Sequence, residues 1–185
     1  HLFALAAALP AQFVSYTKML GQLQDAGNTT TLAHYLKLLE GAFLVSGLEL
    51  FSRNKQRKRG SSPKLVLWNN ALVNALSTRT LGSSITDSIW WGRLVENAVG
   101  AYLCNDLNSI EYSITYWREG HYEVDYVVAR GADIRALEVK SGFGGKLSGL
   151  ARFISRYPDA QPLIIGGPGI PLEDFFSKNV THWLT

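Results

Sequence analysis

The sequence predicts a protein of mixed α and β structure, with a helix-rich first part at residues 1–80 and a second part at residues 81–185 that contains a mixed β-sheet. Of the 185 residues, 46% are apolar, which is enough to form a substantial core. In the first part the apolar residues recur every three or four positions, as in helices, whereas helical and strand-like runs follow one another in the second part. Because only 18% of residues are charged and 11% are aromatic, the composition excludes a coiled coil and a disordered tail.

The single cysteine, Cys104, excludes an intramolecular disulfide framework and a zinc site built on cysteine pairs. This cysteine usage favours a cytoplasmic location. No apolar run reaches the roughly 18 residues that a membrane-spanning helix needs, so we expect no membrane partner. The helical pattern begins directly at His1 without an initiator methionine, and we therefore expect the chain to be a fragment of a longer protein.

The first part reads as helix, turn, helix and hairpin. An apolar stripe at residues 13–20 is followed by a turn at residues 25–28, and three threonines at residues 29–31 are candidate N-caps for the next helix. Strand-like runs at residues 45–51 and 64–68 then enclose a charged loop. This order is typical of a winged-helix unit, and a plain helical bundle with a hairpin is the alternative.

The positive charge of the chain is concentrated in that loop. Six of the 18 Lys and Arg residues lie between positions 53 and 64, with no acidic residue among them. These candidate nucleic-acid-binding residues are Arg53, Lys55, Arg57, Lys58, Arg59 and Lys64. Such a cluster either neutralises the phosphates of a nucleic acid or keeps a hairpin tip solvated, and the sequence leaves both interpretations open.

The second part predicts a long helix, three strands, a helix, a strand and a final helix. The long helix is expected at residues 88–107, where apolar residues share one face. The remaining elements are expected at residues 113–117, 122–129, 134–139, 146–157, 162–165 and 172–177. This order of elements predicts an α/β or α+β domain with a mixed sheet.

The second and third of these strands predict a hairpin that gathers charged residues. Gly131 suits the first central position of a two-residue type II′ turn, so Arg130 and Asp133 are expected to face each other. Continuing that register places Asp125 opposite Glu138, and Glu123 opposite Lys140. All four side chains then project from one face of the hairpin.

Two carboxylates in directly opposed positions repel each other, and this repulsion must be offset. Lys140 contributes one positive charge near Asp125 and Glu138, and a divalent cation bound by both carboxylates would offset it more fully. Mg²⁺ prefers one or two carboxylates together with water and phosphate oxygens. The hairpin therefore predicts a metal site formed by Asp125 and Glu138, and a solvated charged face is the alternative.

The spacing of these residues resembles the core of the PD-(D/E)XK nuclease superfamily, with Val124-Asp125 in one strand and Glu138-Val139-Lys140 in the next. A wider resemblance is to a family of domains of unknown function, number 4143, attached to bacterial and archaeal AAA-type ATPases. The motifs that carry it occur in the same order and are Ser62-Pro63-Lys64, Glu96-Asn97, Tyr116-Trp117-Arg118, Glu123-Val124-Asp125-Tyr126 and Glu138-Val139-Lys140-Ser141. The resemblance implies a winged-helix segment followed by a restriction-endonuclease-like mixed sheet flanked by helices.

The resemblance also implies roles for individual residues. Asp125 and Glu138 would bind Mg²⁺ or Mn²⁺, and Lys140 would position the attacking water and stabilise charge on the phosphate. Glu96, from the long helix, would be a further acidic catalytic residue. ATP would bind only in the N-terminal region of the parent chain, whose ATPase domain would be a partner of this one.

Two functions from different classes follow. The first is a nuclease-like, metal-binding module of an AAA-type ATPase, which would hydrolyse phosphodiester bonds in nucleic acid. The second is a noncatalytic module whose winged helix and charged loop dock nucleic acid or a protein. A homo-oligomeric, regulatory role for the ATPase is a third hypothesis.

Overall fold

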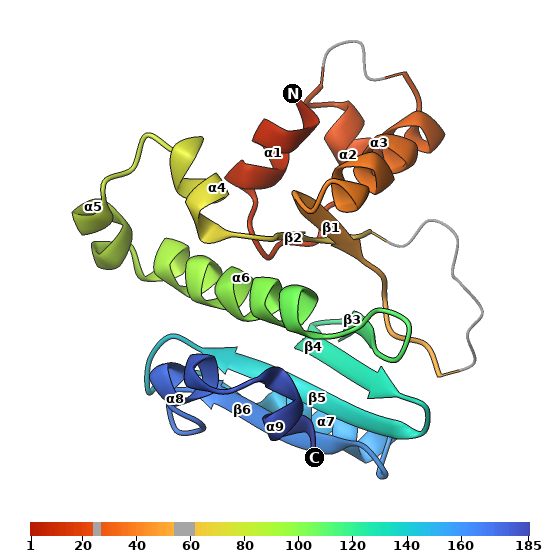
Figure 1. Ribbon diagram of the computed structural model, residues 1–185, viewed down its shortest axis with the longest axis vertical. Helices are drawn as coiled ribbons and strands as arrows, with labels where there is room; N and C mark the ends of the chain where they lie inside the picture. Colours follow the sequence, from red (N-terminus) through yellow and green to blue (C-terminus); the bar gives the residue numbers. More distant parts are fainter. Residues whose placement is uncertain (24–26, 54–61) are drawn as a thin grey trace. The chain divides into compact units, whose positions relative to one another are not determined.

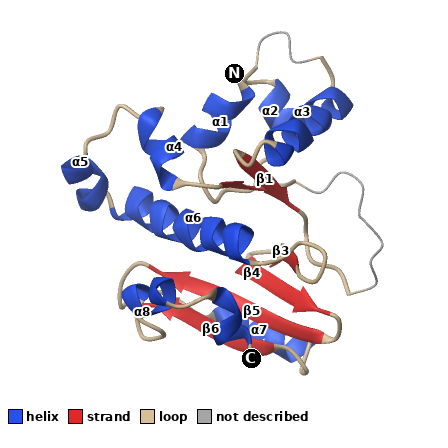
Figure 2. Ribbon diagram, viewed as in Figure 1, coloured by secondary structure: helices blue, strands red, loops and turns tan. Residues whose placement is uncertain are grey.

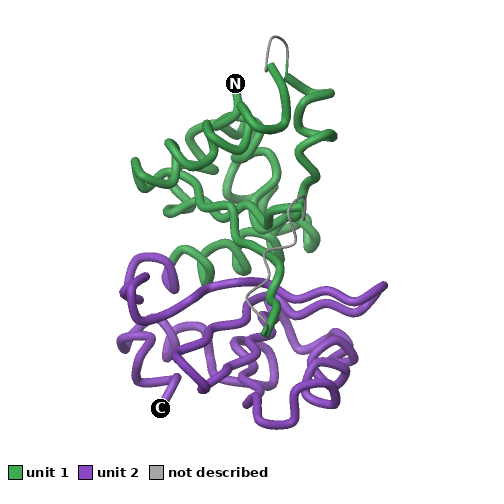
Figure 3. Tube along the Cα trace, turned by 90° about the vertical axis from the view of Figure 1, so that its right-hand side faces the viewer, with its two compact units in different colours: residues 1–101 green, residues 102–185 purple. Residues whose placement is uncertain are grey.

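The computed structural model describes residues 1–23, 27–53 and 62–185. The chain divides into two compact units, residues 1–101 and 102–185, which are coloured separately in Figure 3. Each unit is considered by itself below. Among the described residues, no helix is both long enough and apolar enough to cross a membrane.

Unit 1 contains a group of helices and a two-stranded antiparallel sheet. Its elements are α1 (Leu2–Ala8), α2 (Tyr16–Leu20), α3 (Thr29–Gly41), β1 (Val45–Leu48), β2 (Lys64–Leu67), α4 (Asn70–Ala75), α5 (Leu81–Thr86) and most of α6 (Ser88–Asp106). The predicted order of helix, turn, helix and two strands is therefore present (Figure 1). The cap of α3 differs from the prediction, because the Asn28 side chain accepts hydrogen bonds from the amides of Thr30 and Thr31.

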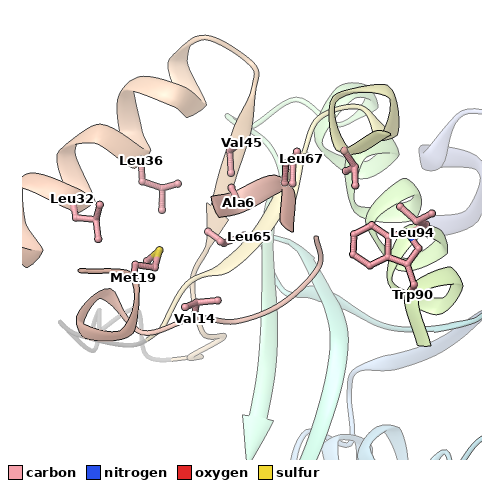
Figure 4. Close-up of a cluster of buried hydrophobic side chains, with 12 residues drawn as sticks. Ala6, Val14, Met19, Leu32, Leu36, Val45, Leu65, Leu67, Trp90 and Leu94 are labelled. Carbon is pink, nitrogen blue, oxygen red and sulfur yellow. The ribbon is translucent and has the colours of Figure 1, made fainter. Parts of the chain in front are cut away.

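The core of unit 1 forms where β1 and β2 meet the helices. Figure 4 shows side chains from α1, α2, α3, both strands and α6 converging on one cluster. Its buried members include Ala6, Val14, Met19, Leu32, Leu36, Val45, Leu65, Leu67, Trp90 and Leu94. Both faces of β2 are buried, which explains why the sequence of this strand is almost continuously apolar after Lys64.

Unit 2 contains a four-stranded mixed sheet with the strand order β3-β4-β5-β6. Its strands are β3 (Ser113–Glu119), β4 (Tyr122–Arg130), β5 (Asp133–Lys140) and β6 (Gln161–Gly166), drawn in red in Figure 2. The first three strands are antiparallel neighbours, and β6 pairs with β5 in parallel. The predicted mixed sheet is thus confirmed.

Helices cover both faces of this sheet. In Figure 1, α7 (Ser148–Arg156) lies behind the sheet, whereas α8 (Leu172–Ser177) and α9 (Val180–Leu184) lie in front of it. The helix α7 packs on β4, β5 and β6, because its residues Leu150 and Phe153 are buried. It begins two residues later than predicted, and α9 was not predicted from the sequence.

The β4–β5 hairpin has the predicted register next to its turn, whereas the predicted pairs Asp125–Glu138 and Glu123–Lys140 are not part of the ladder. Arg130 pairs with Asp133, and the ladder continues to the pair of Tyr126 and Leu137. Gly131 has a φ of 61°, and Ala132 is not among the residues with positive φ. A positive φ at the first central position alone is what a type II′ turn requires, so this short turn fixes which residues face each other along the hairpin.

Candidate functional site

Asp125 of β4 and Glu138 of β5 lie in the interior of unit 2. Their exposed fractions are 7% and 8%, although the sequence left open a solvated charged face. Helix α7 packs on both strands that carry them. Ionised carboxylates lose hydration when they are buried, and they are retained in such positions when cations or hydrogen-bond donors compensate that loss.

The two carboxylates lie just beyond the end of the β4–β5 ladder. The last backbone pair is Tyr126 with Leu137, and beyond it the Asp125 side chain contacts the neighbouring strand. Asp125 Oδ2 accepts a hydrogen bond of 2.8 Å from the Val139 amide. The carboxylate thus satisfies a backbone donor of β5 and keeps the Asp125 side chain beside the Glu138–Lys140 segment.

Lys140 supplies positive charge directly beside Glu138. Its Nζ donates a hydrogen bond of 2.7 Å to Glu138 Oε1, between side chains that are only 15% and 11% exposed. A longer contact of 3.4 Å joins the same Nζ to the carbonyl oxygen of Lys146. The predicted association of Asp125, Glu138 and Lys140 is therefore present within one unit.

Two glycines allow the chain to pass close to Lys140. A Cβ atom at Gly145 would lie 3.2 Å from Lys140 Nζ, and the φ of Gly145 is 121°. A Cβ atom at Gly167 would lie 2.9 Å from Lys140 Cβ. The loops that follow β5 and β6 therefore confine the lysine side chain and restrict the positions that its ammonium group can adopt.

Helix α7 makes an equally close contact with the strand that carries Asp125. A Cβ atom on Gly149 would lie 1.9 Å from the carbonyl oxygen of Glu123, a distance that real Cβ atoms do not adopt. Further along the helix, Phe153 packs edge-to-face on Trp117 of β3, with ring centroids 5.3 Å apart. These contacts hold the sheet and α7 together near the acidic pair.

Glu96 and Lys64 lie in unit 1 and form an ion pair there. Lys64 was predicted to contribute to a nucleic-acid-binding surface, but its side chain is only 2% exposed. The reason is its position at the start of the fully buried strand β2, where Glu96 of α6 neutralises the ammonium group. Lys64 is thus a buried residue of unit 1, and its side chain does not form part of an exposed charged surface.

The rest of the charged loop is only partly described. Arg53 is exposed at the surface of unit 1. Lys55, Arg57, Arg59 and Lys58 lie outside the described residues, so their predicted contact with nucleic acid is addressed by experiment below.

Sequence reasoning missed the role of Asn97, a fully buried amide in α6. Its Oδ1 accepts a hydrogen bond of 3.0 Å from the amide of Leu67, and its Nδ2 donates to the carbonyl of Leu67 and to Asn70 Oδ1. Asn97 therefore hydrogen-bonds both backbone groups of Leu67, the residue of β2 that pairs with Val45 of β1. An amide between the apolar residues of a helix was the signal for this role.

Asp125 and Glu138 would supply only two protein side chains as ligands to a metal ion. Within residues 1–23, 27–53 and 62–185, no group of three or more His, Cys, Asp or Glu side chains is arranged to hold a metal ion. Asp125 and Glu138 nevertheless provide the one or two carboxylates that Mg²⁺ takes from proteins, with water and phosphate oxygens completing the six ligands. The donor set therefore fits Mg²⁺ or Mn²⁺ together with a phosphate-containing substrate.

Comparison with known families assigns two segments of the chain. Residues 91–168 match the family described as Domain of unknown function (DUF4143), which confirms the predicted resemblance to this domain family. Residues 1–83 match a second family, Domain of unknown function (DUF8612). Neither description states an activity.

Comparison with curated proteins gives no significant match. Among solved structures, the crystal structure of protein VC1899 from Vibrio cholerae is similar at 16% sequence identity and a TM-score of 0.26. The alignment covers 99% of this chain and 45% of that chain, so this chain spans less than half the length of the solved one. At such a TM-score the similarity carries no argument about fold or function.

Proposed function

We propose that unit 2 is a nuclease-like module that binds a divalent metal ion and hydrolyses phosphodiester bonds in nucleic acid. The observation that carries this proposal is the buried pair of Asp125 and Glu138 on adjacent strands, with the Lys140 ammonium 2.7 Å from Glu138. Burying two carboxylates is costly, and a bound cation would compensate part of that cost. The PD-(D/E)XK resemblance assigns metal binding to the same two residues.

The residues of the site divide the chemistry between them. When bound, Mg²⁺ or Mn²⁺ would polarise a phosphodiester and lower the pKa of a coordinated water molecule. Asp125 and Glu138 would hold the ion, and the hydrogen bond from the Val139 amide keeps Asp125 oriented. Lys140 would stabilise the negative charge that develops on the phosphate and position the attacking water. The resemblance would add Glu96 as a further acidic residue; it lies in unit 1, where it pairs with Lys64, and its role in cleavage is tested by substitution.

Calorimetric titration with Mn²⁺ and Mg²⁺ tests the metal site directly. We expect wild-type protein to bind the ion and both Asp125→Asn and Glu138→Gln to lose binding, because each removes one anionic ligand. Asp133→Asn is the matched control, since it neutralises an exposed carboxylate at the far end of the same hairpin. Absence of binding to the wild type at millimolar metal, or equal binding by all four proteins, would contradict the proposal.

Cleavage assays with DNA and RNA, single-stranded and duplex, then separate binding from catalysis. Lys140→Met should bind the metal as the wild type does but cleave about 100-fold more slowly, the usual effect of removing one group that stabilises transition-state charge. Glu96→Gln is assayed in the same way. A wild type that binds metal yet cleaves none of these substrates would leave the module with a binding role only.

A noncatalytic docking function is the second candidate, and the observation in its favour is the succession of α2, α3, β1 and β2 in unit 1, the order of a winged helix. Neutralising Arg57, Lys58 and Arg59 together should then weaken nucleic-acid binding and flatten its salt dependence, without any requirement for metal. The resemblance further supports the proposal that both modules belong to an AAA-type ATPase, whose own domain would bind ATP.

A further inference from the structure

The loop that follows Lys140 presents an aromatic side chain to solvent. Phe143 is 92% exposed and stands between Gly142 and Gly144, at which an added Cβ atom would meet nothing within 4 Å. Exposing a phenylalanine this fully is unfavourable, since burying such a side chain in an apolar environment is favourable. A ligand that covered the ring would therefore gain binding energy.

Both ends of this loop lie close to other residues of unit 2. Near its start, the carbonyl oxygen of Gly142 lies 2.6 Å from the position that a Cβ atom on Gly167 would take. At its end, Gly145 lies against Lys140, and the carbonyl of Lys146 accepts a hydrogen bond of 3.4 Å from Lys140 Nζ. The loop is therefore close to neighbouring residues at both ends, and Phe143 lies between these contacts.

The charges around the loop indicate what the ring could contact. Lys146 is exposed and lies three residues after Phe143, whereas Lys140, the last residue of β5, is only 15% exposed and is paired with Glu138. An aromatic ring with a cationic side chain on the same short loop matches the alternating bases and phosphates of a nucleic acid. An apolar protein surface or an acyl chain would meet only the ring and gain nothing from Lys146.

We infer that Phe143 stacks on an unpaired base of a single-stranded nucleic acid while Lys146 contacts its backbone, so that single strands are the preferred substrate class. This inference rests on the proposed function, because it concerns the same site. A base inside a duplex has both faces covered by its neighbours, whereas a base in a single strand offers its face to an aromatic side chain.

The test is binding of a fluorescein-labelled, mixed-sequence 20-nucleotide DNA in EDTA, measured by fluorescence anisotropy beside the matching duplex. Phe143→Ala should weaken binding of the single strand about 5- to 100-fold, the range reported for loss of one stacked base, and change duplex binding by less than about 2-fold. Phe143→Trp should restore the affinity. Ile110→Ala is the matched control, since Ile110 is also 92% exposed in unit 2 and should have no effect.

A second variant, Lys146→Gln, tests the proposed contact with the nucleic-acid backbone independently. It should weaken single-strand binding and reduce the slope of log Kd against log salt by about 0.7, as expected for one phosphate contact. The inference is overturned if wild-type protein does not bind the single strand, if Phe143→Ala binds it as tightly as the wild type, or if strand and duplex are weakened equally. Because the assay contains no metal, failure here with intact calorimetric metal binding would refute stacking alone, whereas loss of metal binding would refute the catalytic proposal.

Discussion

Asn97 shows how one buried side chain supports unit 1. Asn97→Leu would leave the amide and the carbonyl of Leu67 without the partners that the side chain now provides. Because each buried backbone group without a partner costs about 1–3 kcal/mol, we expect urea unfolding to show a stability loss of about 2–5 kcal/mol. Asn74→Leu, at an exposed position of α4, should change the stability by less than about 0.5 kcal/mol. Equal losses in both variants would contradict this role.

Glu119 gives a pH-dependent prediction at the same scale. A hydrogen bond of 2.7 Å from Arg152 lowers the pKa of Glu119 below its ordinary value of 4.5, and Arg156 adds a second contact of 2.8 Å. In an NMR titration, Arg152→Gln should raise this pKa towards the ordinary value. Since the folded-state pKa is lowered, the contact stabilises the protein above pH 4.5 and is lost as the pH falls through the lowered pKa.

The control for this titration is Arg135→Gln, which removes a guanidinium group that makes no contact with Glu119 and should leave the pKa of Glu119 unchanged. The difference in stability between wild type and Arg152→Gln should also disappear in acid. A titration midpoint at or above the ordinary glutamate value in the wild type would show that the ion pair does not form in solution.

At the residue scale the sequence predicted charges and turns better than burial. The pairing of Arg130 with Asp133 follows from Gly131, because turn geometry is local. Asp125 is instead buried, which depends on how distant parts of the chain pack, and composition does not reveal that packing. The cap of α3 was assigned to the threonines because their hydroxyl groups suit it, whereas Asn28 holds the position one residue earlier.

At the scale of elements, Gly149 tests how α7 is seated on β4. Helix propensity alone would make Gly149→Ala stabilising by up to about 1 kcal/mol. The Cβ atom would, however, overlap the carbonyl oxygen of Glu123, so we expect calorimetry to show a destabilisation of about 1–3 kcal/mol. Gly142→Ala, where a Cβ atom meets nothing within 4 Å, is the control and should leave the melting temperature nearly unchanged. A stabilised Gly149→Ala protein would refute the close contact.

The elements themselves were largely predictable, because most have a clear period of apolar residues. The prediction for residues 172–177 coincides with α8, and the long helix ends within one residue of α6. The strand expected at residues 45–51 ends earlier, at Leu48, since its pairing with β2 ends at Lys64. Helix α9 was missed because five residues are too few to show a helical period.

At the scale of the whole molecule, the proposed metal site predicts an effect confined to part of the chain. Mn²⁺ at about 100 times its Kd should stabilise the folded state by about 2.7 kcal/mol and slow amide exchange in β4 and β5 up to about 100-fold. Amides of β1 and β2, which belong to unit 1, should be much less affected. Hydrogen exchange with mass spectrometry measures both, and Asp125→Asn should abolish the effect. Uniform slowing throughout the chain, or none, would contradict a site in unit 2.

The sequence predicted only those residues of the candidate site that lie on the two strands of the β4–β5 hairpin. The turn and a period of two pointed to Asp125, Glu138 and Lys140, although the observed ladder ends before them and the Val139 amide holds Asp125. The ion pair of Glu96 with Lys64 joins a helix and a strand 32 positions apart, and no local pattern specifies such a contact. The exposure of Phe143, between two glycines, could not be predicted, since exposure depends on the surrounding fold.

Asp125 has two roles, because it accepts a hydrogen bond from the Val139 amide in the sheet and is also a proposed metal ligand. Asparagine keeps an oxygen that can accept the same hydrogen bond, whereas alanine keeps none. Asp125→Ala would therefore remove the hydrogen-bond acceptor of the Val139 amide together with the proposed metal ligand. Loss of activity in that variant would not show which of the two losses caused it. For this protein the choice between two routine substitutions decides whether a negative result can be interpreted.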